Sequence, residues 1–187
     1  MRNELISPLK RIQLQQDSIF KELEKIDLEI LKLKPSENAW SSIEVVQHIY
    51  LIELMSLKYI QKKLQFIDYL PNRKILSLLR YALMKLVLQT PAKFKAPKSK
   101  LKAEFNSLQE AQLKWAELRA DLEKTLEKIP NSVINGLLWK HPLAGKMSVN
   151  HMLLFFHDHS ERHKKQIERT LAVVSQNNFK NEKILST

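Results

Sequence analysis

The chain contains no cysteine and only two glycines among its 187 residues. Without cysteine it can form no disulfide, no thiolate metal site and no cysteine nucleophile. Glycine is needed in the tight turns of sheets and in loops that wrap phosphate groups. Its scarcity argues against a mainly β or doubly wound fold and against a glycine-rich nucleotide loop. The sequence therefore favours an all-α protein whose chemistry depends on other side chains.

Long hydrophobic runs are also missing. No segment approaches the length of a membrane-spanning helix, and Met1–Gln16 lacks the apolar stretch and cleavage site of a secretory signal. By default we therefore expect a cytoplasmic protein. A 187-residue chain that is 44% hydrophobic and 27% charged is typical of one globular domain. We expect this domain over residues 1–175, followed by a polar tail over 176–187.

Positive charge is concentrated in one segment. Pro71–Ala103 contains nine lysines and arginines and no acidic residue, although the whole chain has a formal net charge of only +11. Removing these nine charges leaves about +2 for the rest of the chain. A localised excess of this kind indicates a basic patch, a mobile loop or a lid rather than a broad nucleic-acid footprint.

Hydrophobic periodicity and capping motifs predict five helices. Capping boxes, Ser41 with Glu44 and Ser107 with Glu110, open the second and the fourth. The four long helices would bury their apolar stripes best as an antiparallel four-helix bundle. The short third helix and the basic loop after it form an excursion between bundle helices two and three. The predicted helices cover residues 5–33, 41–66, 74–89, 107–130 and 148–174.

Two histidines lie four residues apart in the last predicted helix. Residues at this spacing differ in direction by about 40°, so His159 and His163 project from one face, one turn apart. One interpretation is a pair of partly exposed histidines on a polar face. The nearby Phe155 and Phe156 instead favour a position at or near the core. A buried pair needs a carboxylate, a water or a metal as its partner.

A third metal ligand should come from another helix. His48 is the best candidate, because it is the only histidine in the first 140 residues and lies on the second predicted helix. Three neutral imidazoles suit Zn²⁺, Ni²⁺ or a similar divalent ion and leave positions for water or substrate. Gln166, three residues after His163, could orient a ring or a bound water. Glu44 is expected as the helix cap, with an outer-sphere role as the alternative. We expect His141, His151 and His157 to lie outside the metal site.

Three motifs in this order resemble the DinB-like superfamily of helical proteins. The first is Trp40–Glu44 leading to His48, the second is His141–Ser148 with its His-Pro-x-x-Gly turn, and the third is His159–Ile167. The resemblance spans Trp40–Leu171, which is most of the chain.

The resemblance implies a four-helix bundle with up-down-down-up topology and a metal site formed by His48, His159 and His163. Members with known activity are metal-dependent transferases or isomerases that use low-molecular-weight thiols such as bacillithiol or mycothiol, and members often form dimers. On this basis we expect a divalent-metal protein that acts on a small molecule, as a hydrolase or as a thiol transferase with such a thiol as cofactor, and that forms a homodimer. The basic excursion departs from the family pattern and leaves the substrate open.

A second hypothesis is a non-catalytic helical binding module. The helix predicted over residues 74–89 is basic and amphipathic, which is typical of a helix that contacts a membrane surface or a partner protein. Its many apolar residues favour a buried bundle helix or a dimer surface. Nucleic acid is the less favoured partner, because the basic segment has few aromatic residues, Tyr81 and Phe94 among them, and no base-reading motif.

Overall fold

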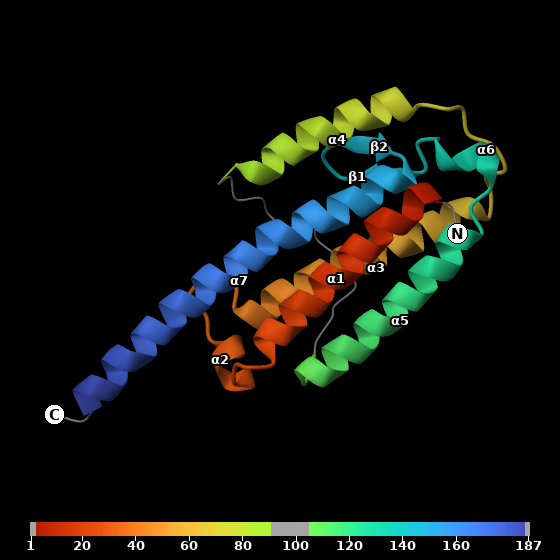
Figure 1. The fold of residues 1–187 in the computed structure, drawn as a ribbon. Coiled ribbons are helices and arrows are strands. Elements are labelled where there is room, and N and C mark those ends of the chain that lie inside the picture. The colour runs from red at the N-terminus through yellow and green to blue at the C-terminus, as the bar shows by residue number, and fades with distance from the viewer. Residues whose placement is uncertain (1–2, 91–104, 186–187) are drawn as a thin grey trace.

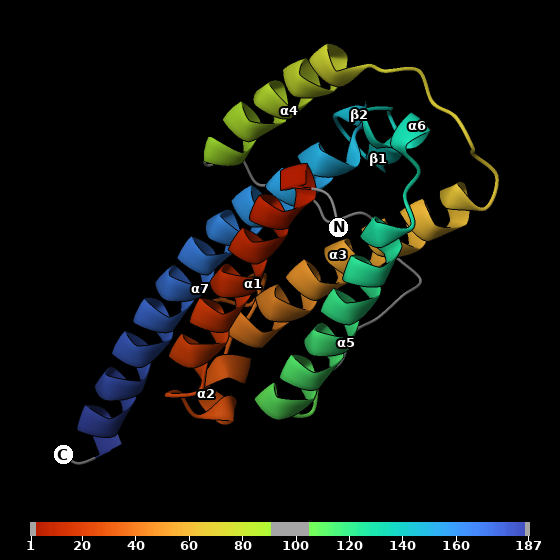
Figure 2. The same ribbon diagram turned by 45° about the vertical axis from the view of Figure 1, so that its right-hand side comes forward.

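The protein is an all-α bundle, as predicted. The computed structural model describes residues 3–90 and 105–185, with side chains placed for 4–90 and 105–177. In Figures 1 and 2, the first and last bundle helices run in one direction and the two middle ones run in the other, which is the up-down-down-up order. The first and last helices lie side by side, and so do the middle two. The four bundle helices are α1 (Asn3–Leu23), α3 (Ser42–Leu64), α5 (Leu108–Glu127) and α7 (Val149–Leu185).

Side-chain caps explain where two of these helices begin. Before α3, Ser41 Oγ accepts from the Glu44 N–H at 3.3 Å, and the Glu44 carboxylate accepts from the Ser41 N–H at 2.8 Å. The predicted capping box is therefore complete, and Glu44 is part of it. Before α5, Ser107 accepts from the Glu110 N–H at 3.0 Å, but the Glu110 carboxylate accepts from the Asn106 N–H instead.

The first predicted helix is interrupted, contrary to the expectation of one helix over residues 5–33. α1 ends at Leu23, and the short α2 (Leu28–Lys32) follows after a turn. Asp27 causes the restart, because its carboxylate accepts from the Glu29 N–H at 2.9 Å and caps α2. Leu31 of α2 is fully buried, which fixes this turn against the bundle.

A small β-hairpin precedes α7, where the sequence predicted only a loop. The four-residue α6 (Asn131–Ile134) leads into strands β1 (Trp139–His141) and β2 (Gly145–Met147), which pair antiparallel with Trp139 opposite Met147. Gly145 has a φ of +79°, which few other residues adopt readily. Strands of three residues are too short to show a period in the sequence.

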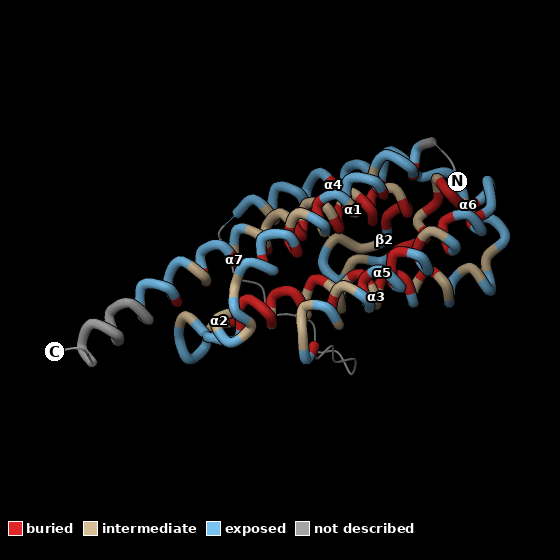
Figure 3. The backbone as a smooth tube through the Cα atoms, turned by 60° about the horizontal axis from the view of Figure 1, so that its bottom comes forward, coloured by how far each residue is buried: buried red, intermediate tan, exposed pale blue. Residues whose placement is uncertain are grey.

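Helix α4 (Lys74–Gln89) forms the predicted excursion, and it packs on α7 and the hairpin. Its buried residues are Ser77, Tyr81 and Met84, and Figure 3 shows most of its remaining surface as exposed. Of the two alternatives for this helix, burial inside the bundle is therefore wrong, and a dimer surface stays a prediction. The basic loop over residues 91–103 lies outside the described residues.

The core fills the space between the four bundle helices, with Leu5, Ile12, Ile49, Leu122 and Phe156 among its fully buried side chains. Helix α7 continues to Leu185, beyond the end expected near residue 174. The side chains of the predicted tail from residue 178 onward are outside the described residues. Among the described residues, every helix is too short or too polar to cross a bilayer.

Candidate metal centre

Helix α7 brings two imidazoles together inside the bundle. His159 and His163 lie one turn apart on the same face, and their Nε2 atoms are 3.1 Å from each other. Each residue is only 8% exposed to solvent. The Phe155 ring, one turn before His159, lies 5.0 Å from the His159 ring and covers the site from that side. The interpretation of a polar, solvent-facing pair is therefore wrong.

His48 of α3 approaches the same point from the neighbouring helix. Its ring centroid lies 5.2 Å from that of His159 and 4.8 Å from that of His163. One ring nitrogen from each of the three histidines lies within 4.8 Å of the others, and this group could hold a metal ion. The Trp40 ring packs against His48, with the two ring centroids 5.0 Å apart. The structure thus brings together the three residues that the sequence selected.

The three imidazoles are neutral near pH 7, because burial disfavours their charged form. Burial lowers the pKa of His48 to about 4 and that of His163 to about 3. Burial also holds the pKa of His159 well below 6.5, and the nearby His163 and His48 lower it further by charge repulsion. A neutral imidazole keeps a nitrogen lone pair that can bind a metal, so protons do not compete for this group at neutral pH.

Gln166 and Glu44, the two expected supporting residues, lie in different places. The Oε1 atom of Gln166 accepts from Nδ1 of His163 at 2.9 Å, which places the ring proton on Nδ1 and leaves the lone pair on Nε2. The carboxylate of Glu44 caps α3 and contacts Lys34 Nζ at 2.9 Å.

The histidines that we expected outside the site make other contacts. His151 Nδ1 lies 2.7 Å from Ser77 Oγ of α4 and 2.9 Å from Ser148 Oγ, in a fully buried cluster. His157 Nδ1 lies 3.3 Å from the Asp158 carboxylate. Both rings therefore have hydrogen-bonding partners away from the three-histidine group.

His141 lies closer to the three-histidine group than the sequence suggested. Its ring packs 4.8 Å from the Phe155 ring, and its charge, when present, lowers the pKa of His159. Its Nδ1 accepts from the backbone N–H groups of Leu143 and Ala144 at 3.2 and 3.1 Å, so the ring proton sits on Nε2. The hairpin creates this position. The motif His-Pro-x-x-Gly was the available signal, but it indicated a turn rather than a neighbour of the site.

This geometry predicts how His141 affects stability in acid. Burial lowers its pKa from 6.5 to about 4 in the fold, so its contribution to folding is complete above pH 6.5 and is lost as the pH falls toward 4. His141→Asn keeps an acceptor for the two N–H groups but cannot titrate. As the pH falls from 6.5 toward 4, the free energy of unfolding of metal-free wild type should decrease by up to about 1 kcal/mol per pH unit more than that of the variant. Urea unfolding at several pH values measures both. Equal slopes for the two proteins would contradict this account.

Comparison with known proteins gives one result. The family model described as the DinB superfamily matches residues 11–167, a range that includes the three clustered histidines and Gln166. No curated protein and no solved structure matches the chain.

Proposed function

Since the chain belongs to the DinB superfamily, we propose that His48, His159 and His163 bind one divalent cation, such as zinc or nickel, each through one ring nitrogen. The convergence of three neutral imidazoles from two helices, with His159 and His163 buried and His48 half-buried, is the observation that supports this proposal. Two nitrogens on a tetrahedral zinc ion lie about 3.3 Å apart at ordinary bond lengths. The 3.1 Å between Nε2 of His159 and Nε2 of His163 is close to that separation.

Three protein ligands are typical of reactive rather than structural metal sites. A cation held in this way acts as a Lewis acid that lowers the pKa of a bound water or thiol. The chain supplies the surroundings for such a nucleophile. Trp40 and Phe155 line the histidines with apolar surface, which limits water around the site. Gln166 fixes the tautomer of His163, and the ring of His141, from the hairpin, packs against Phe155.

We further propose that the protein acts on a small molecule, either as a transferase for a low-molecular-weight thiol of the bacillithiol type or as a hydrolase. These two reactions differ only in whether a thiol or a water serves as nucleophile. Both need the same open position beside the three imidazoles. A cytoplasmic location and a homodimer stay predictions from the sequence.

Metal content tests the first part of the proposal. We expect untagged wild-type protein to contain about one zinc or nickel ion per chain by elemental analysis, after reconstitution if necessary. A protein that takes up no divalent metal would overturn the proposed site.

An activity assay tests the second part. The metal-loaded protein is offered bacillithiol with an electrophile, and loss of free thiol is followed. A parallel reaction without thiol reports hydrolysis. Absence of thiol turnover in every metal form would remove the transferase and leave the metal site itself intact.

Gln166→Leu should weaken metal binding by about 10- to 100-fold, because the proton of His163 would no longer be held on Nδ1. Isothermal titration with zinc measures the change. Gln166→Glu keeps an acceptor at the same position and should bind metal at least as tightly as wild type. Equal affinities for Gln166→Leu and wild type would show that this contact does not support the site.

A further inference from the structure

Helix α4 is attached to the molecule by one face only. Ser77 bonds to the His151 ring at 2.7 Å, and the Tyr81 hydroxyl donates to Asp158 at 2.6 Å, so both link α4 to α7. Met84 is buried on the same side. Figures 1 and 2 show α4 along the outer edge of the fold, with no other described helix beyond it.

The opposite face of α4 is apolar and open to solvent. The four most exposed large apolar side chains of α4 share this face. At about 100° per residue, they fall within an arc of roughly 80°, on the side of the helix away from Ser77 and Tyr81. The outward face of a helix on a globular protein is usually polar, so this reversal calls for a partner. The four are Ile75, Leu79, Leu83 and Leu86, which are 77%, 58%, 66% and 61% exposed.

Cations border this apolar arc on both sides. By helical position, Lys85 lies about 80° from one edge of the arc, with Lys74 about 20° beyond it, and Arg80 lies about 60° from the other edge. Lys85 Nζ is 3.6 Å from the Asp158 carboxylate of α7, and Arg80 donates to the Lys146 carbonyl of β2 at 2.7 Å. Both side chains therefore run from α4 toward its neighbours, on either side of the exposed apolar face. The hairpin beside α4 adds Lys140 and Lys146, both exposed. No acidic residue occurs anywhere in Pro71–Ala103.

We propose that this face of α4, defined by Ile75, Leu79, Leu83 and Leu86, docks on an anionic lipid surface. A helix of 16 residues lies in the plane of such a surface, with its apolar side chains among the acyl chains and its flanking cations at the headgroups. A second copy of the chain is a poorer occupant, because its own α4 would bring the same cations to the interface and no carboxylate. The surface is separate from the three histidines, so it does not depend on the proposed catalytic function.

Vesicle flotation with the full chain tests the proposal. We expect binding to phosphatidylcholine vesicles that contain about 30% phosphatidylglycerol, weaker binding to pure phosphatidylcholine, and release as salt rises to about 0.5 M. The triple variant Leu79→Gln, Leu83→Gln, Leu86→Gln should lose more than about tenfold in partitioning. The double variant Leu14→Gln, Leu113→Gln is the matched control, because these leucines are 60% and 61% exposed on α1 and α5. It should bind as wild type does.

The absence of cysteine allows a second readout that does not depend on the stability of the triple variant. A polarity-sensitive fluorophore on Leu86→Cys should shift to the blue with anionic vesicles, and the same label on Leu113→Cys should not. Failure of the wild type to bind these vesicles, or equal shifts at both positions, would overturn the proposal. A lipid-free dimer that the triple variant abolishes would overturn it too, since a second copy would then cover the face.

Discussion

Replacing His159 with alanine is expected to abolish stoichiometric metal binding, with a loss of affinity well above the roughly 100-fold ceiling for supporting residues. His159 lies between the His48, His163 and Phe155 rings, so its loss removes the ligand that contacts both other histidines. His48→Ala and His163→Ala should produce losses of the same order. Zinc titration calorimetry and elemental analysis measure all three.

His157→Ala is the matched control for these variants. This variant removes an imidazole from the same helix, two residues before His159. The Nδ1 atom of His157 lies 3.3 Å from the Asp158 carboxylate, and its ring is not part of the three-histidine group. The metal content and affinity of His157→Ala should equal those of wild type. If all four variants kept the wild-type metal content, the ion would have to bind elsewhere, and the proposed site would be wrong.

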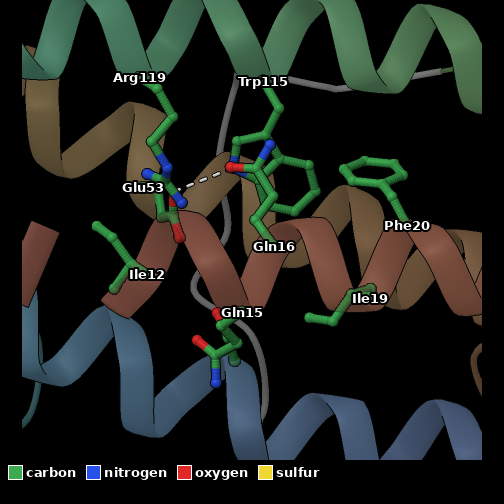
Figure 4. A pocket seen from close by; sticks show the side chains of 9 residues that line it. Ile12, Gln15, Gln16, Ile19, Phe20, Glu53, Trp115 and Arg119 are labelled. Atoms are coloured by element: carbon green, nitrogen blue, oxygen red, sulfur yellow. Dashed lines mark hydrogen bonds and ion pairs between the residues drawn. The ribbon is translucent and has the colours of Figure 1, made fainter. Parts of the chain in front are cut away.

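Glu53→Ala should destabilise the fold by about 3–5 kcal/mol, because it leaves a buried guanidinium without its counter-ion. Glu53 and Arg119 are 2% and 6% exposed and form an ion pair between α3 and α5. The Trp115 indole N–H also donates to the Glu53 carboxylate at 3.1 Å. Figure 4 shows these side chains meeting beside a small cavity that Gln16 and Phe20 also line. Urea unfolding followed by helical circular dichroism measures the effect.

Two further variants test whether the destabilisation by Glu53→Ala comes from the unpaired buried charge or from a general loss of packing. The double variant Glu53→Leu, Arg119→Met removes both charges and should recover most of the lost stability. Glu29→Ala, which breaks the exposed pair with Lys32, should cost less than about 1 kcal/mol. A double variant as unstable as Glu53→Ala would contradict this explanation.

Local patterns were enough to predict much of this protein. The capping box at Ser41 and Glu44 set the start of α3, and the spacing of His159 and His163 put both rings on one face because helix geometry fixes that direction. The selection of His48 followed from its place on another bundle helix. Such features depend on a few neighbouring residues, so a single sequence is sufficient to find them.

Features that depend on distant contacts were missed or misjudged. The break at Asp27 competes with a periodic apolar stripe that continues through it, and the burial of Leu31 against the bundle adds to the local cap by Asp27. The position of His141 beside Phe155 requires the hairpin to form. The Glu53–Arg119 pair joins residues 66 positions apart, for which one sequence offers no signal.

Helix α4 is bonded to α7, or to the residue just before it, near both of its ends, so we expect the four long helices alone to be a less stable fold than the whole chain. Arg162, next to His163 in the chain, donates to the carbonyl oxygens of Leu88 and Thr90 where α4 ends, both at 2.6 Å. At the other end of α4, Ser77 accepts from the Ser148 N–H at 2.7 Å, just before α7 begins. A shortened chain without the excursion would lose these hydrogen bonds, which lie on either side of the turns that carry His159 and His163. Engineers who seek a smaller scaffold should therefore retain α4 and change only its outward leucines.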